Sequence, residues 1–232
     1  MSYFLLIETS QKPCSVALAK NDLIVSNLET FEEKAHTSNL PVFIKKIMED
    51  AGLEFNQLSA VAVSKGPGSY TGLRIGVSAA KGICYGADLP LIAIDTLKIM
   101  CYNAISSFSN IDNNVLLCPM IDARRMEVYY AIYNTNLIPI SETNSKIIET
   151  GCFDDILENN KIYFFGDGAE KTNRIIKHPN AYFIRDVFPL ARFMTKEAKN
   201  MFNNKEFADT AYFEPFYLKE FQTTTQKKNI FK

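Results

Sequence analysis

The stretch from residue 64 to residue 86 constrains this chain most, because a glycine turn leads directly into a glycine-rich helix. It reads SKGPGSYTGLRIGVSAAKGICYG. Pro67 fixes one φ angle and the glycines beside it permit positive φ, so the chain can reverse tightly after a buried strand. Ser69 or Thr71 then supplies the N-cap of a helix over about residues 70–86.

One face of this predicted helix carries almost no side chain. Gly72, Gly76 and Ala80 recur at every fourth position, and Ala79 and Ile83 lie beside them. A glycine inside a helix costs about 1 kcal/mol relative to alanine, so something must offset that loss. We therefore expect another backbone to approach this face closely.

Two interpretations of the turn stay open. A helix N-terminus offers free N–H groups and the positive end of a dipole, so the turn is a candidate phosphate cradle. The alternative is a structural turn that feeds a tightly packed helix. We favour the structural turn because no Gly-Lys-Ser/Thr follows at the helix start, and Lys65 stands before the turn.

Length and charge limit the functions that this chain can perform alone. Its 232 residues suffice for one large domain or two smaller ones. The net charge is −1, with six arginines among 25 basic residues, so the chain has no strong electrostatic footprint for nucleic acid. If RNA is involved, we expect a partner to hold it.

Cysteines and the N-terminus indicate a cytoplasmic protein. The five cysteines are scattered and form no Cys-x-x-Cys pair, which is typical of buried thiols in a reducing compartment. The apolar run at the N-terminus ends at Glu8 and follows no basic segment, so it is too short for a signal peptide or a membrane span.

The residues of common catalytic centres are scarce. The two histidines, His36 and His178, belong to no His-x-x-x-His or His-Glu-x-x-His motif, and no Gly-x-Ser-x-Gly elbow occurs. We interpret His36 as a polar neighbour of the first helix. The sequence therefore predicts no catalytic residue, no metal site and no cofactor.

The order of predicted elements indicates an internal duplication. We expect strands at 3–9, 14–19, 23–31, 58–64 and 91–94, with helices at about 38–52, 70–86 and 96–106. The pattern then restarts with strands at 115–121, 127–133 and 137–148, a helix at 152–158, a strand at 162–165, a helix at 169–177, a strand at 182–184 and a long helix at 189–202. We therefore expect the chain to contain two strand-rich α/β units.

We accordingly expect an N-terminal domain over residues 1–106, a C-terminal domain over 107–218 and a flexible tail over 219–232. The long helix at about 189–203 either closes the second domain or crosses back to the first.

Four segments, in order, resemble the TsaB (YeaZ) family. They are Leu6 to Ser10 with Cys14 to Leu18, Gly66 to Gly76, Ile121 to Tyr129, and Pro215 to Lys219. The second segment is the most specific. The resemblance implies an actin-like, sugar-kinase-like (ASKHA) fold. It also implies a non-catalytic role in making threonylcarbamoyladenosine in tRNA.

The same resemblance implies partners. TsaB-like proteins pair with themselves or with TsaD, the paralogue that carries the metal and nucleotide sites, and a TsaE-like ATPase joins the pair. The tRNA is then contacted only indirectly through the complex, and no membrane is involved. Pairing uses the first two helices, which here carry the apolar stripe of Leu40, Phe43, Ile44, Ile47 and Met48 and the face of Gly72, Ile75, Gly76, Ala79, Ala80 and Ile83. The alternative is that both stripes face the protein's own sheet.

Lesser candidates concern phosphate and RNA. A vestigial nucleotide or phosphate site would use Glu8, Thr9 and Ser10 with Gly166, Asp167 and Gly168, but we favour an ordinary turn for the first segment, and Gly-Asp-Gly turns like the second are common. Arg124 and Arg125 are candidates for an RNA or partner contact, with a solvated hairpin tip as the alternative. An ATP-dependent small-molecule kinase of the same fold is the alternative function, and no nucleophile supports a glycoprotease.

Overall fold

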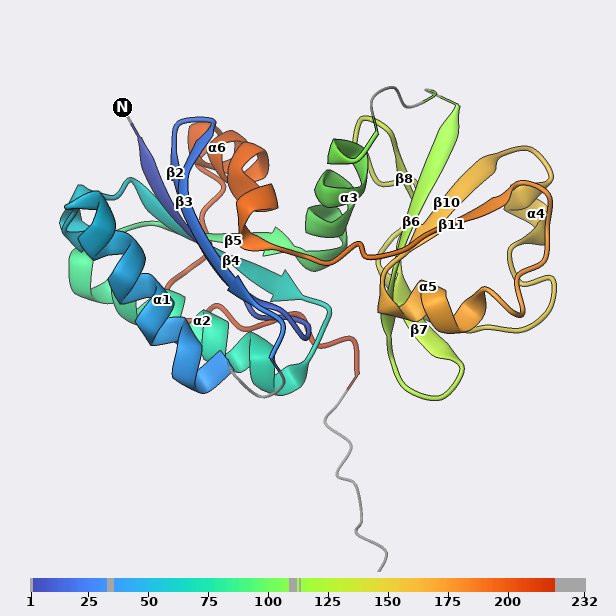
Figure 1. Cartoon of the computed structure of the whole chain (residues 1–232), viewed down its shortest axis with the longest axis horizontal. Helices are drawn as coiled ribbons and strands as arrows, with labels where there is room; N and C mark the ends of the chain where they lie inside the picture. Colours follow the sequence, from blue (N-terminus) through green and yellow to red (C-terminus); the bar gives the residue numbers. More distant parts are fainter. Residues whose placement is uncertain (1, 33–35, 109–111, 113, 220–232) are drawn as a thin grey trace, which may run out of the picture.

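The chain folds into two β-sheets that stand side by side, each covered by helices (Figure 1). The computed structural model describes residues 2–32, 36–108, 112 and 114–219. The first sheet consists of β1 (Tyr3–Glu8), β2 (Cys14–Lys20), β3 (Leu23–Thr30), β4 (Ala60–Gly66) and β5 (Leu91–Asp95). Its strands lie in the order β3-β2-β1-β4-β5.

The second sheet repeats this topology. It consists of β6 (Val115–Asp122), β7 (Glu127–Tyr130), β8 (Tyr133–Asn134), β9 (Asn144–Ile147), β10 (Lys161–Phe165) and β11 (Ala181–Ile184). In the order β9-β7-β6-β10-β11, three antiparallel strands are followed by two parallel ones, as in the first sheet, and β8 pairs with β6. The predicted duplication of an α/β unit is confirmed.

Helices cover both faces of the first sheet. The helices are α1 (His36–Ala51), α2 (Tyr70–Ala87), α3 (Thr96–Ser106), α4 (Asp154–Leu157), α5 (Asp167–Thr172) and α6 (Thr195–Asn203), with 3₁₀ turns η1 (Phe55–Gln57) and η2 (Ala191–Met194). Helices α1 and α2 lie side by side on one face, whereas η2 and α6 cover the other (Figure 1). Helix α3 stands between the sheets and packs against both.

The apolar run of β1 explains why two layers form. Successive side chains of a strand point to opposite faces, so a continuous apolar run needs cover on both sides. Leu5 and Ile7 pack beneath α1 and α2, whereas Phe4 and Leu6 pack beneath η2 and α6. The predicted helix after the glycine turn is confirmed as α2, with Ser69 as its N-cap.

Two predicted elements in the second half are wrong in extent. Leu137 has a φ of +60°, which is not a strand conformation, and Pro139 pairs with Tyr133 only through an isolated β-bridge, so only β9 remains of the strand expected over 137–148. The helix expected from 189 begins later. Leu190 is extended, and the Ala191 amide donates to Ser15 Oγ at 2.9 Å instead of continuing a helix.

The chain ends on the first sheet again. After α6, residues 209–219, which we call the C-terminal strap, run back along α2 (Figure 1). Lys81 Nζ donates to the carbonyl oxygens of Ala211 and Phe213, and Phe216 N donates to Lys65 O at 2.7 Å. Residues 220–232 of the predicted tail lie outside the described residues. Within the described part, every helix is too short or too polar to span a bilayer.

Candidate functional site

The small-residue face of α2 is covered by the chain itself. A Cβ added at Gly72 would lie 2.0 Å from Thr9 O, and one at Gly76 would lie 2.2 Å from Thr9 Oγ1. Thr9 Oγ1 also donates to Gly72 O at 2.7 Å. The backbone that approaches these glycines is therefore the β1–β2 turn. The prediction that Gly72, Gly76 and the fully buried Ala80 face a partner is wrong.

The predicted stripe of α1 is largely internal too. Leu40, Ile44, Ile47 and Met48 are buried in the core between the helices and the first sheet, so they are also wrong as contact residues. The physical reason is that a helix on a sheet turns its apolar stripe toward the sheet. The remaining candidates are partly buried at the edge of that core, and they are Phe43, Ile75, Ala79 and Ile83.

A different set of residues faces outward from the two helices. Val42 on α1 is 58% exposed and Tyr85 on α2 is 88% exposed. Ser78, Gly82 and Gly86 are exposed on α2 at every fourth position, and a Cβ at either glycine would meet no atom within 4 Å. We call these five residues the outer α1–α2 face. The sequence already holds this second row of small residues, but its spacing is the same as that of the buried row.

A cleft of about 920 Å³ opens between the two sheets. It is lined by Ser10 and Gln11 of the β1–β2 turn, by Ser69 at the start of α2, and by Arg124 and Arg125 of the β6–β7 turn. Residues 216–219 of the C-terminal strap also line it. The structure thus brings together Ser10, both arginines and Asp167 of the predicted site residues, from segments far apart in the sequence.

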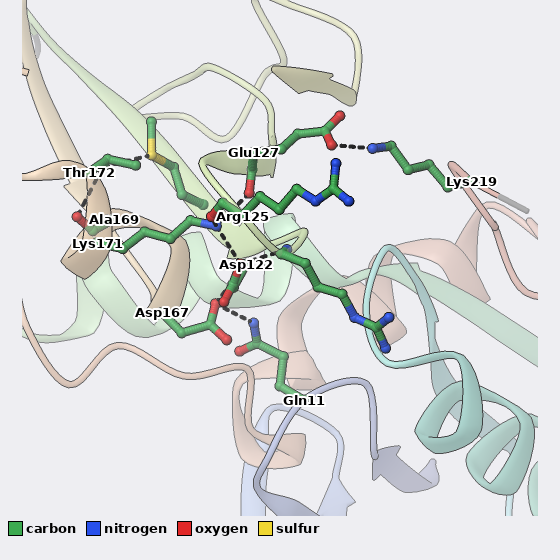
Figure 2. A network of polar contacts seen from close by, with 11 residues as sticks. Gln11, Asp122, Arg125, Glu127, Asp167, Ala169, Lys171, Thr172 and Lys219 are labelled. Carbon is green, nitrogen blue, oxygen red and sulfur yellow. Dashed lines mark hydrogen bonds and ion pairs between the residues drawn. The ribbon is translucent and has the colours of Figure 1, made fainter. Parts of the chain in front are cut away.

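A polar network ties the two halves together across this cleft (Figure 2). Asp167 Oδ1 accepts from Gln11 Nε2 at 3.1 Å and from Asp122 N at 2.9 Å. Lys171 Nζ makes an ion pair with Asp122 and donates to the carbonyl oxygens of Arg125 and Glu127. Burial raises the pKa of Asp167, because removal from water disfavours the charged carboxylate.

The C-terminal strap closes the network at its outer edge. Lys219 makes an ion pair with Glu127, and its hydrogen bond lowers the pKa of that carboxyl (Figure 2). Arg124 and Arg125 both have positive φ, at 70° and 49°, and both are exposed. Neither guanidinium forms a hydrogen bond or an ion pair with any residue that the structure describes.

Glu8 does not reach the cleft. It is fully buried, it accepts from Ser10 N at 2.5 Å, and its Oε2 has no hydrogen-bond partner within the described chain. Burial raises its pKa from 4.5 to about 7, an effect that the nearby Ser10 and Ser64 hydroxyls oppose without adopting hydrogen-bond geometry. Thr9 is likewise buried against α2. Neither residue is placed to bind phosphate.

The turn at 166–168 also faces the protein interior. A Cβ at Gly166 would lie 2.4 Å from Met120 O, and one at Gly168 would lie 2.9 Å from the Ile121 carbonyl carbon. These glycines therefore serve the close packing of α5 on β6. Only Asp167 of this turn lines the cleft.

Both histidines bond to the protein's own backbone. His36 Nε2 lies 2.8 Å from Gln11 O, and His178 Nδ1 accepts from Asn180 N at 3.2 Å. Across residues 2–32, 36–108, 112 and 114–219, no three His, Cys, Asp or Glu side chains gather as metal ligands.

Comparisons with known proteins agree on one family. The family model described as "TsaD: tRNA N6-adenosine threonylcarbamoyltransferase" matches residues 30–221. The tRNA threonylcarbamoyladenosine biosynthesis protein TsaB of Buchnera aphidicola subsp. Acyrthosiphon pisum is 35% identical over 159 residues, which are 68% of this chain and 70% of the relative. TsaB of Buchnera aphidicola subsp. Schizaphis graminum is 30% identical over 198 residues, which are 80% of this chain and 90% of the relative.

A solved structure gives the same answer for the fold. The structure described as YeaZ from Pseudomonas aeruginosa superposes with a TM-score of 0.77 at 23% identity, covering 94% of this chain and 100% of that chain. The two sheets of matching topology thus form the fold of YeaZ, the duplicated fold that the resemblance implies. The chain therefore belongs to the TsaB (YeaZ) family, whose members found here are named for tRNA threonylcarbamoyladenosine biosynthesis.

Proposed function

We propose that this chain acts in the biosynthesis of threonylcarbamoyladenosine in tRNA as a non-catalytic subunit that binds and activates a TsaD-like transferase. Membership of the TsaB family supports the pathway. The match to the TsaD description over residues 30–221 supports a paralogue of the transferase. The observation that carries the pairing is the exposed row of small residues on α2.

The glycines of α2 fall into two sets that differ in what lies beside them. Gly72 and Gly76 are explained within the chain, because Thr9 occupies the space of a side chain. Gly82 lies inside the helix, and a Cβ there would meet no atom of this chain within 4 Å. A glycine at this position destabilises the helix by about 1 kcal/mol relative to alanine, and no close packing within this chain compensates for that cost. A partner helix that crosses there can approach to about 8 Å between axes, the low end of the usual range.

The neighbours of Gly82 suit such a contact. Tyr85 is 88% exposed, and large aromatic side chains of this kind commonly anchor protein interfaces. Beyond these neighbours, Val42 is an exposed apolar side chain on α1, the helix that packs beside α2. In the absence of the TsaD-like protein, the same face would hold a second copy of this chain, so that homodimer and heterodimer exclude each other.

Further parts of the proposal rest on family resemblance. A TsaE-like ATPase joins the assembled pair, and the complex works in the cytoplasm. Residues 1–106 and 107–218 remain the two expected units, with residues 191–203 of the second packed on the first sheet. Non-catalytic status is supported by the placement of the histidines, since His36 bonds to the backbone of Gln11 and His178 to the backbone of Asn180.

The test uses Gly82→Leu, with Gly82→Ala as the matched control. Leucine is a better helix former than glycine by roughly 1 kcal/mol, so both variants fold at least as well as the wild type. We expect Gly82→Leu to abolish co-purification with a TsaD-like protein and to leave a monomer in light scattering. Gly82→Ala should weaken both interactions less. Wild-type pairing by a well-folded Gly82→Leu chain refutes this contact face.

Gly76→Leu is unsuitable as a probe of pairing. Its side chain would strike Thr9, so the variant would lose stability whether or not a partner binds.

A further inference from the structure

We propose that the cleft between the two sheets binds a short single-stranded segment of RNA directly. Phosphates would lie on Arg124 and Arg125, and bases would lie against the aromatic rings of the cleft wall. This goes beyond the proposed function, and it differs from the expectation that this chain contacts tRNA only indirectly through the complex.

The first step concerns charge. Three acidic side chains line the cleft, but each is already occupied: Asp122 pairs with Lys171, Glu127 pairs with Lys219, and Asp167 accepts two hydrogen bonds. The guanidinium groups of Arg124 and Arg125 remain unpaired within the described chain. The cleft is therefore locally cationic although the whole chain carries a net charge of −1.

The second step concerns shape and polar contacts. Ser10 and Gln11 line the cleft, and Gln11 Oε1 is buried with no hydrogen-bond partner among the residues described. A buried polar atom without a partner costs about 1–3 kcal/mol, so Gln11 Oε1 indicates a bound polar group. The N-terminus of α2 opens beside them at Ser69, where the helix dipole favours a negative charge.

The third step identifies the ligand. Tyr70, Tyr129, Phe216 and Tyr217 line the same cleft, and Phe216 is 42% exposed. The rings of Tyr70 and Tyr217 lie 4.8 Å apart and contact each other, and the Arg74 guanidinium lies 4.2 Å from the centre of the Tyr70 ring, so the bases would stack on Tyr129 and Phe216. Aromatic rings interleaved with arginines are typical of single-stranded nucleic-acid sites, where each stacked base contributes about 1–3 kcal/mol.

A free mononucleotide suits the site less well. The glycines of the 166–168 turn pack onto β6, so only Asp167 of that turn lines the cleft. The cavity of about 920 Å³ lies within the roughly 300–1,000 Å³ typical of small-molecule pockets, so its volume admits either ligand. A strand that passes through the cleft uses both the arginines and the rings.

The experiment measures binding of a fluorescent single-stranded RNA oligonucleotide to the full chain by anisotropy over a series of salt concentrations. The test variant is Arg124→Gln/Arg125→Gln. The control is Arg174→Gln/Arg185→Gln, which removes the same charge at exposed positions outside the cleft. A second variant, Phe216→Ala, removes a ring and no charge.

We expect the test variant to bind at least about tenfold more weakly, because each charge-assisted contact is worth about 1.5–3 kcal/mol. The slope of log K against log salt should fall by about 1.4, or roughly 0.7 for each of two phosphates. The control should keep the wild-type slope, and Phe216→Ala should lose affinity with an unchanged slope.

Equal losses in test and control variants would overturn the proposal, as would binding of ATP in the cleft without binding of RNA. Co-purification with the TsaD-like partner distinguishes RNA binding in the cleft from the proposed pairing through α2. The arginines lie on the β6–β7 turn and not on α1 or α2, so Arg124→Gln/Arg125→Gln should still co-purify with that partner. If Gly82→Leu fails to disturb pairing, the RNA-binding result is unaffected. If the arginine variant fails to weaken RNA binding, the pairing result is likewise unaffected.

Discussion

The buried carboxyl of Glu8 should make the stability of this protein fall as pH rises toward neutrality. Burial raises the pKa of Glu8 from 4.5 to about 7. As pH rises, Glu8 therefore loses its proton near pH 4.5 in the unfolded chain but only near pH 7 in the folded chain. Below the unfolded pKa both states are protonated and stability is unaffected. As pH rises from there to the folded pKa, the unfolded state gains an increasing advantage.

The size of the effect follows from the two pKa values. One pKa unit corresponds to about 1.4 kcal/mol, so ionisation of the unfolded state removes about 3 kcal/mol once pH exceeds the folded pKa. Between about pH 5 and pH 8 the loss is about 2.5 kcal/mol. Glu8→Gln removes this dependence and keeps the shape of the side chain. Its amide can donate to the unpartnered Ser10 and Ser64 hydroxyls.

The assay is urea unfolding at about pH 5, 6, 7 and 8, with an exposed carboxylate variant, Glu32→Gln, as the control. Subtraction of the Glu8→Gln curve from the wild-type curve isolates this one group from the other carboxyls. We expect the wild type to lose about 2.5 kcal/mol more than Glu8→Gln across the range. Parallel curves for the two proteins would refute the argument from burial.

Three further predictions test the packing. Gly72→Ala should destabilise the chain by several kcal/mol in thermal unfolding, because its Cβ would lie 2.0 Å from a carbonyl oxygen, whereas Gly82→Ala should stabilise it by up to about 1 kcal/mol. Glu197→Gln should lower the free energy of unfolding by about 1–2 kcal/mol, since the partly buried Lys98 loses a charged partner at 2.6 Å. In urea unfolding, the slope of that free energy against urea concentration should not change. Glu49→Gln should change stability by less than about 0.5 kcal/mol, because its ion pair is exposed.

Local patterns were enough to predict the order of the first half of the chain. The apolar run of β1, the cap at Ser69 and the one-sided stripe of α1 each depend on neighbouring residues alone. The second half was harder, because its errors depend on distant partners. Ser15 holds the Ala191 amide and delays the last helix, and nothing near residue 191 in the sequence indicates that contact.

The candidate site shows the same limit. Periodicity identified Gly72 and Gly76 as a bare face but not Thr9, the residue that fills it. The row with exposed glycines has identical spacing, so only the packing distinguishes the two. Of the cleft, Ser10, Asp167 and the two arginines were predicted, but Gln11 and the C-terminal strap were missed, because they converge on the cleft from widely separated segments.

Because η2 and α6 lie on the first sheet, this sheet cannot finish folding until the C-terminal part of the chain has been synthesised. One side of the first sheet, with Phe4, Leu6 and Ile92, is covered by residues 191–203. During synthesis that side stays open to water until the last helix leaves the ribosome. A fragment truncated after residue 106 would keep all five strands of the first sheet but would expose the apolar face that η2 and α6 cover. It should therefore aggregate rather than fold as an independent unit.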